Sequence, residues 1–181
     1  MKGKIGLEEH FAIEDTLNDS KGFFPDDIWV EVRERILDLH GRRLRLMDEF
    51  GMDMMILSLN APAIQAIADP KKANEIARKA NDYLAEQVRK RPDRFQALAA
   101  LPLQDPDLAA RELHRCVKDL GMIGALANGF SQIGDANTIP TWTKSSTGHF
   151  AAWSNSLTCR STCIRAIRCR RIPESTRITA G

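Results

Sequence analysis

The chain has 181 residues, of which 43% are hydrophobic and 28% are charged, and its formal net charge is +2. This composition is typical of a soluble globular protein that buries a core, and no stretch approaches the ~20 apolar residues of a membrane-spanning helix. The N-terminal residues lack the apolar core of a signal peptide and the balanced charge does not require nucleic acid, so we expect a cytoplasmic protein without nucleic-acid or membrane partners.

The average charge conceals a change in composition near residue 140. Residues 141–181 contain seven basic residues and one acidic residue, which leaves 19 basic and 23 acidic residues, a net charge of −4, in residues 1–140. Three of the four cysteines also lie in residues 141–181. A change this sharp indicates two parts that are best interpreted separately.

The first predicted elements are a strand, a helical region and a second strand. Residues 4–10 and 54–59 are short apolar runs that end in polar or small residues, which is typical of strands buried on both faces. Between them, apolar residues at helical spacing predict a helical region over residues 26–50 that is broken at Gly41.

The next elements repeat this order. Asp69 followed by proline predicts the start of a helix that Pro92 ends, and residues 95–102 form the next apolar run. Asp105, again followed by proline, starts a helix that ends at Gly121, and a fourth apolar run follows. Strands that alternate with helices predict a parallel sheet with right-handed crossovers.

Two architectures fit this alternation, an open doubly wound sheet and a (β/α)8 barrel. A glycine-rich phosphate loop would favour the open sheet, and the sequence contains none. In both architectures active sites gather at the carboxyl ends of the strands. The polar residues predicted at such ends are Glu8, Glu9, His10, Asn60 and Asn128.

Glu8 and His10 are the candidate metal ligands. Side chains alternate along a strand, so these two are expected on one side and Glu9 on the other. A carboxylate beside an imidazole suits a divalent metal, although a catalytic site usually needs at least three protein ligands. The alternative is a surface glutamate beside a polar histidine.

Other residues near the strand ends have two interpretations each. Asn60 and Asn128 either orient a polar substrate or form turns after their strands. Phe23 and Phe24 either line an aromatic pocket or anchor a loop to the core. Cys116 lies on the apolar stripe of its helix, which favours a core position over a nucleophile.

Five stretches of the first part carry a family resemblance. Residues 1–132 resemble the gamma-resorcylate (2,6-dihydroxybenzoate) decarboxylases of the amidohydrolase superfamily, and His10 favours this branch over related dihydroxybenzoate decarboxylases. The matching stretches are residues 4–12, 55–63, 91–95, 100–107 and 128–132.

The resemblance implies a metal-dependent (β/α)8 TIM barrel, usually a homotetramer, that decarboxylates an ortho-hydroxybenzoate without an organic cofactor. It implies zinc or manganese as the metal, with Glu8 and His10 as ligands from the first strand. Phe23 and Asn128 match family positions near the small aromatic carboxylate substrate. The family's proton donor and remaining ligands come from later strands, so no catalytic residue is identified in this chain.

The second part does not continue the family pattern. A barrel of this kind needs about 250 residues, so we expect residues 1–138 to form its N-terminal half. Codons for residues 160–169 can be chosen that spell Phe-Tyr-Leu-His-Pro-Arg-Asn-Pro, the family's next strand motif, in another reading frame. We therefore predict that residues 139–181 are an aberrant, disordered, out-of-frame tail.

Several alternatives to this interpretation are open. The tail could be a basic arm that binds nucleic acid, or Cys159, Cys163, Cys169 and His149 could bind zinc, although their spacing is not that of a standard zinc site. The protein could instead be an amidohydrolase-superfamily hydrolase that uses metal-bound water. It could also persist as a non-catalytic fragment that acts only as a binding or assembly partner. We expect the 181-residue chain alone to be inactive and poorly folded.

Overall fold

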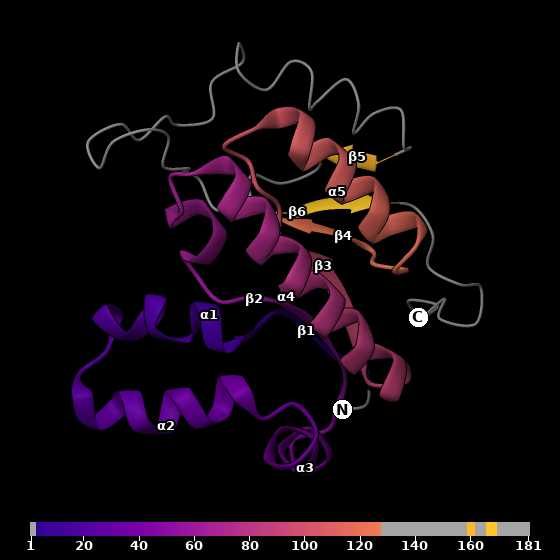
Figure 1. The fold of residues 1–181 in the computed structure, drawn as a ribbon. Coiled ribbons are helices and arrows are strands. Elements are labelled where there is room, and N and C mark those ends of the chain that lie inside the picture. The colour runs from indigo at the N-terminus through magenta and orange to yellow at the C-terminus, as the bar shows by residue number, and fades with distance from the viewer. Residues whose placement is uncertain (1–2, 128–158, 162–165, 170–181) are drawn as a thin grey trace.

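The structure, a computed structural model, describes residues 3–127, 159–161 and 166–169 (Figure 1). Helices and strands alternate along most of this part of the chain, as the sequence predicts. In chain order the elements are β1 (Lys4–Phe11), α1 (Glu14–Leu17), η1 (Asn18–Phe23), α2 (Asp26–Leu37), α3 (Arg42–Glu49), β2 (Met52–Leu59), η2 (Ala63–Ala66), α4 (Pro70–Lys90), β3 (Phe95–Ala99), α5 (Pro106–Lys118), β4 (Gly124–Leu126), β5 (Cys159–Ser161) and β6 (Ala166–Cys169).

The strands form one sheet in the order β1-β2-β3-β4-β6-β5. The first four strands pair in parallel with their sequence neighbours, which confirms the predicted parallel sheet. Parallel neighbours in sequence order are the arrangement of the first half of a (β/α)8 barrel, and the described residues do not close the sheet on itself. Helices α4 and α5 lie together over one face of the sheet, and α1–α3 extend from its β1 side (Figure 1).

The strands β5 and β6 add an antiparallel hairpin to β4. They belong to the predicted tail, residues 139–181, and they are the only parts of it that the structure describes. The division at residue 138 and the out-of-frame origin of the tail therefore stay predictions.

Capping residues explain where the helices begin. The Asp69 carboxylate accepts a hydrogen bond from the backbone N–H of Lys71, and Asp105 accepts from the N–H groups of Asp107 and Leu108. The predicted helical region over residues 26–50 divides into α2 and α3, as expected from Gly41. There the Asp38 carboxylate accepts from the N–H of Gly41 and so supports the start of α3.

The core lies between the sheet and helices α4 and α5. Its buried members come from alternate positions of the strands and from the apolar stripes that the sequence predicts for both helices. Residues from five of these elements include Phe11, Leu57, Leu59, Ala77, Leu84, Phe95, Ala97, Leu113 and Cys116. A smaller cluster of Ala12, Leu17 and Trp29 holds α1 and α2 against the end of β1. No helix in the described residues has the length and hydrophobicity needed to span a membrane.

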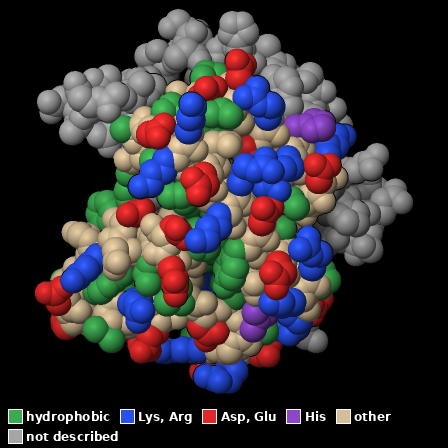
Figure 2. Space-filling view, viewed as in Figure 1, with side chains coloured by type: hydrophobic (Ala, Val, Ile, Leu, Met, Phe, Trp, Pro, Cys, Tyr) green, Lys and Arg blue, Asp and Glu red, His purple; other side chains and the backbone are tan. Residues whose placement is uncertain are grey.

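The opposite surface of these helices is polar. Basic and acidic side chains alternate over the face formed by α4 and α5 (Figure 2). Ion pairs there include Lys90 with Glu86 and Arg115 with Asp82. These charged side chains form a solvated face on the outside of the two helices.

Candidate active site

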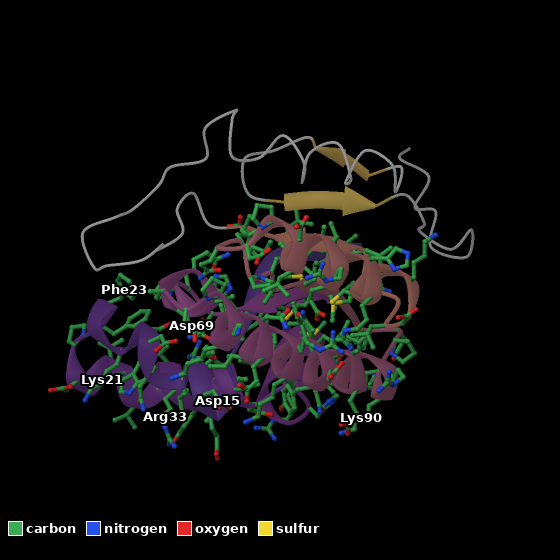
Figure 3. The ribbon with its side chains drawn as sticks, turned by 45° about the horizontal axis from the view of Figure 1, so that its top comes forward. Asp15, Lys21, Phe23, Arg33, Asp69 and Lys90 are labelled. Atoms are coloured by element: carbon green, nitrogen blue, oxygen red, sulfur yellow. The ribbon has the colours of Figure 1, made fainter. Side chains whose placement is uncertain are left out.

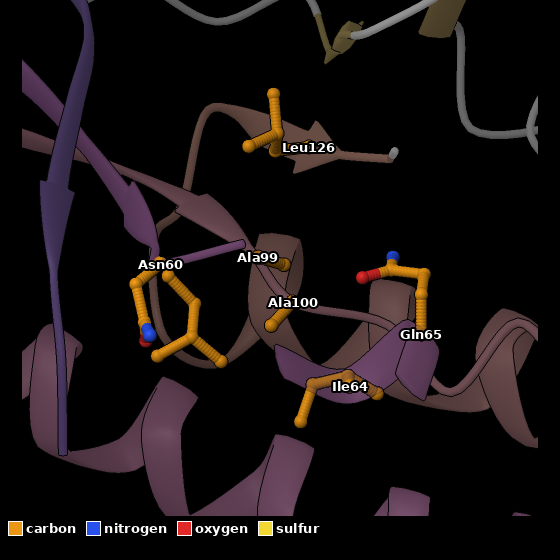
Figure 4. A pocket seen from close by; sticks show the side chains of 7 residues that line it. Asn60, Ile64, Gln65, Ala99, Ala100 and Leu126 are labelled. Atoms are coloured by element: carbon orange, nitrogen blue, oxygen red, sulfur yellow. The ribbon is translucent and has the colours of Figure 1, made fainter. Parts of the chain in front are cut away.

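A hollow opens at the carboxyl ends of β2, β3 and β4, where the parallel topology predicts a site (Figure 4). It is shallow and open to solvent, with a free volume of about 10 Å³, which is about the space of one water molecule. Five of its seven lining residues are apolar and two carry amides, and polar and apolar surface line it about equally. The lining residues are Leu59, Asn60, Ile64, Gln65, Ala99, Ala100 and Leu126.

The candidate metal ligands lie at the carboxyl end of the adjacent strand, β1. Glu8 is exposed and His10 is half-buried. The His10 ring is held by the neighbouring strand, because its Nδ1 atom lies 3.1 Å from the Oγ atom of Ser58. Which ring nitrogen can bind a metal depends on whether Nδ1 donates or accepts in this contact.

A β-bulge interrupts β1 at Leu7 and Glu8. Gly6 pairs with Met55 and Glu9 with Leu57, so two residues of β1, Leu7 and Glu8, lie opposite one residue of β2. The simple alternation expected from the sequence does not extend across a bulge. The expected placement of Glu8 and His10 on one side therefore stays a prediction.

The side chain of Glu9 packs closely against Gly6 at this bulge. A Cβ atom added to Gly6 would lie 2.9 Å from the Cγ atom of Glu9 and 2.7 Å from its Oε1 atom. A larger residue at position 6 would therefore require the flexible side chain of Glu9 to shift.

Arg43 fixes the backbone at the end of β1. One guanidinium nitrogen, Nη2, donates to the carbonyl of His10 at 2.7 Å and to that of Arg35 at 3.0 Å. Burial lowers the pKa of Arg43, and the charges of Glu9 and Asp38 oppose that shift. An arginine stays charged at any physiological pH, so it supplies a permanent cation behind the candidate ligands.

Asn60 is buried. The sequence predicts that it either orients a substrate or forms a turn. Its Nδ2 donates to the carbonyl of Thr16 and to Ser20 Oγ, both at 2.8 Å, and its Oδ1 accepts from Thr16 Oγ1 at 2.9 Å. Ser20 in turn donates to the carbonyl of Ala61. The side chain of Asn60 is thus engaged in joining the α1–η1 segment to the end of β2.

A second polar network, which sequence reasoning missed, holds the end of β3. Asn81 of α4 donates to the carbonyl of Ala100 and accepts from its N–H, both at 2.9 Å. Asn81 also donates to the carboxylate of Glu112, which is 1% exposed and pairs with Arg78 and Arg115. The sequence feature that could have predicted this network is the position of Asn81 and Glu112 beside the apolar stripes of their helices.

Cys116 occupies the core position that the sequence predicts. Its side chain is buried, and its Sγ lies 3.4 Å from the Oε1 atom of Glu112. Burial, together with the nearby carboxylate, raises the pKa of the thiol well above its usual range. A thiol that stays protonated is a poor nucleophile.

The other candidate residues lie away from the hollow or outside the described residues. Phe23 projects from η1 at the periphery and is 69% exposed (Figure 3). Phe24 stacks on Trp29, with ring centroids 6.2 Å apart, which supports its interpretation as an anchor. Asn128 and His149 lie outside the described residues, and so do the side chains of the tail cysteines.

Glu8 and His10 fit part of a divalent metal site. An oxygen and a nitrogen donor suit zinc or manganese, and the Ser58 contact at His10 Nδ1 is the kind of outer support that metal-binding histidines have. The part of the chain that the structure describes contains no group of three or more His, Cys, Asp or Glu residues that could hold the ion. Further ligands are therefore needed from elsewhere.

Comparisons of the sequence with known proteins identify its family. The family profile described as "Amidohydrolase" matches residues 13–155. A gamma-resorcylate decarboxylase of Polaromonas sp. (strain JS666) is 69% identical over 132 residues, which cover 73% of this chain and 40% of that protein. The chain thus spans about two fifths of the length of this curated relative.

Solved structures give the same result for the fold. A dihydroxybenzoic acid decarboxylase from Polaromonas sp. JS666, with bound manganese and the inhibitor 2-nitroresorcinol, matches with a TM-score of 0.83 and 59% identity over 86% of this chain and 47% of that one. A 2,6-dihydroxybenzoate decarboxylase complexed with 2,6-dihydroxybenzoate matches with a TM-score of 0.81 and 58% identity, over 87% of this chain and 48% of that one. The predicted fold class, an incomplete barrel of this type, is confirmed.

Proposed function

Because this chain belongs to the amidohydrolase family, we propose that it contributes the first strands of a metal-dependent decarboxylase. The proposed reaction is the non-oxidative removal of carboxylate from an ortho-hydroxybenzoate such as 2,6-dihydroxybenzoate. The observation that carries this proposal is the 69% identity over 132 residues to a gamma-resorcylate decarboxylase. The manganese in a similar decarboxylase structure supports a divalent metal cofactor, either manganese or zinc.

The proposed chemistry explains why such a site needs a metal and a proton donor. Direct loss of carbon dioxide from a benzoate would leave an unstable aryl carbanion, whereas protonation of the ring carbon that bears the carboxylate avoids it. A divalent metal supplies Lewis acidity and a template for the substrate's carboxylate and neighbouring oxygen. A nearby acid then delivers the proton to the ring carbon.

In the proposed reaction, the residues of this chain bind the metal and orient the substrate. Glu8 and His10 would hold the metal. Apolar residues at the ends of β2 and β4, such as Leu59 and Leu126, would form one part of the wall around the aromatic ring. Phe23 and Asn128 are proposed as substrate neighbours from the family resemblance. The described residues supply two of the needed ligands and no assigned proton donor, so we expect the 181-residue chain alone to be inactive.

An assay of two proteins tests the function. We expect a gene with the reading frame restored after residue 138 to encode a protein that, with manganese or zinc, converts 2,6-dihydroxybenzoate to resorcinol. The 181-residue chain should show no conversion under the same conditions. Hydrolysis of an ester or amide without decarboxylation would instead favour a hydrolase, and robust decarboxylation by the 181-residue chain would contradict the partial site.

The tail proposal has its own test, which is sequencing of the gene. The 132-residue match to the Polaromonas relative supports a change of frame in the last part of the chain. The family profile runs on to residue 155, so the DNA decides whether the change lies at residue 138 or later. If the codons for residues 160–169 do not spell the strand motif in another frame, the tail proposal is wrong.

We also propose that the restored protein is a cytoplasmic homotetramer without nucleic-acid or membrane partners. The family resemblance supports the tetramer, and the absence of a membrane-spanning helix in the described residues is compatible with the location. Light scattering of the restored protein during size-exclusion chromatography measures the oligomeric state directly. A stable monomer with full activity would contradict the proposed assembly.

A further inference from the structure

The contact between His10 and Ser58 links β1, which carries the candidate metal ligands, to the adjacent strand β2. The two residues are register partners on β1 and β2. Ser58 is fully buried, and its Oγ lies 3.1 Å from His10 Nδ1. It is the one hydrogen-bond partner found for the His10 ring among the described residues.

The direction of this hydrogen bond decides which ring nitrogen can bind a metal. A neutral imidazole carries one N–H and one lone pair. If Nδ1 carries the proton and donates to Ser58, the lone pair is on Nε2. If Ser58 donates to Nδ1, then Nε2 carries the proton and cannot bind a metal ion.

We propose that Ser58 is a positioning residue that accepts the Nδ1 proton of His10 and so keeps Nε2 free for the metal. This inference rests on the proposed function, in which His10 is a metal ligand. Any state with a metal on Nε2 requires a proton on Nδ1, and in the partly buried setting of β1 that proton needs an acceptor. Ser58 Oγ is the acceptor that the structure places there.

Arg43 supports the same arrangement from the backbone. Its Nη2 donates to the carbonyl of His10 at 2.7 Å, so the main chain that carries the ring is fixed independently of Ser58. With the main chain held in this way, Ser58 governs the orientation and tautomer of the ring. The two contacts therefore have separable effects.

The test compares Ser58→Ala with Ser58→Thr in the 181-residue chain and in the frame-restored protein, because the shorter chain is expected to fold poorly alone. Threonine keeps the hydroxyl and suits a strand, whereas alanine removes the hydroxyl. Ser20→Ala is the matched control, because Ser20 is also a buried serine with two hydrogen bonds but does not touch His10. Circular dichroism identifies any variant that does not fold.

The first measurement is the tautomer of His10, from ¹⁵N chemical shifts of its ring at about pH 8.5, where an ordinary histidine is neutral. Assignment uses the signal lost in His10→Gln. We expect the Nδ1–H tautomer in the unchanged chain, in Ser58→Thr and in Ser20→Ala, and a shift toward Nε2–H in Ser58→Ala. An Nε2–H ring in the unchanged chain, or an unchanged tautomer in Ser58→Ala, would overturn the inference.

The second measurement is the affinity of the frame-restored protein for Mn²⁺ alone, followed by electron paramagnetic resonance, because the described residues of the 181-residue chain supply only two candidate ligands. We expect Ser58→Ala to weaken binding about ten-fold and Ser58→Thr to retain it. If no variant binds Mn²⁺ but the tautomer changes as expected, the proposed metal site fails while the role of Ser58 stands. If Ser58→Ala binds Mn²⁺ as tightly as the unchanged chain does, the role of Ser58 fails.

Discussion

At the scale of single residues, polar side chains fix the backbone around the hollow. Asn81 satisfies both the N–H and the carbonyl of Ala100 at the point where β3 ends. Because a buried backbone group without a partner is costly, this asparagine determines where the strand stops and the wall of the hollow begins. The buried Glu112 holds Asn81 in this position and is itself neutralised by Arg78 and Arg115.

Replacement of Asn81 tests this role. We expect Asn81→Ala to lower the free energy of unfolding by about 2–3 kcal/mol, because it leaves two buried backbone groups and part of a buried carboxylate without partners. Urea denaturation measures the loss, and hydrogen exchange should show faster exchange at the Ala100 amide. The control is Asn74→Ala, which alters a half-buried residue of the same helix and should cost less than about 0.5 kcal/mol.

The Cys116 thiol provides a second residue-scale prediction. Its raised pKa means that the reactive thiolate is scarce at about pH 8.5, and burial also blocks access. We expect iodoacetamide to leave Cys116 unmodified in the native chain and to modify it in urea, as mapped by mass spectrometry of peptides. Rapid modification of native Cys116 would mean that α5 does not pack as described.

At the scale of elements, helix starts are encoded locally. The Asp-Pro pairs before α4 and α5 provide a capping carboxylate and a residue with the backbone angle of a first helical turn. The β1 strand is different, because its bulge appears only in its pairing with β2. Local sequence therefore predicts the helix boundaries better than it predicts the orientation of residues at the end of β1.

The caps of α4 and α5 can be compared directly. Asp105 accepts two backbone hydrogen bonds and Asp69 accepts one. We expect Asp105→Ala to lower the free energy of unfolding by about 1 kcal/mol and Asp69→Ala by less, with Asp105→Asn close to the unchanged chain. Thermal unfolding followed by circular dichroism checks this order. Equal losses for the two alanine variants would contradict it.

At the scale of the whole molecule, the sheet has a free edge. β1 forms one end of the sheet in the described residues, and its side chains Ile5 and Leu7 are 39% and 64% exposed. Unpaired backbone groups beside exposed apolar side chains favour pairing with other chains. This is the physical basis for expecting the 181-residue chain to be poorly folded or to associate with itself.

A charge placed on this edge tests that expectation. We expect Leu7→Lys to reduce self-association of the 181-residue chain, because a lysine on an edge strand opposes further pairing. Size-exclusion chromatography with light scattering measures the effect. Phe50→Lys is the matched control, since Phe50 is 62% exposed but follows α3 and lies on no strand. An equal effect of both substitutions would point to general solubility instead.

Sequence alone determined the order of elements, the parallel sheet, the helix caps and the position of Glu8 and His10 at a strand end. These follow from periodicity and capping, which act over a few neighbouring residues. The sequence predicted an apolar run to residue 102, whereas β3 ends at Ala99, since Asn81 takes up the backbone groups of Ala100 from another element.

Only the tertiary structure decided which distant groups meet at the carboxyl ends of the strands. Ser58 reaches the ring of His10, Arg43 reaches its carbonyl, and Asn60 joins a loop more than forty positions earlier in the chain. These contacts depend on strand register and on how helices cross the sheet, which no local pattern records. On the proposal that Glu8 and His10 bind a metal, the remaining ligands would likewise come from distant strands that complete a barrel.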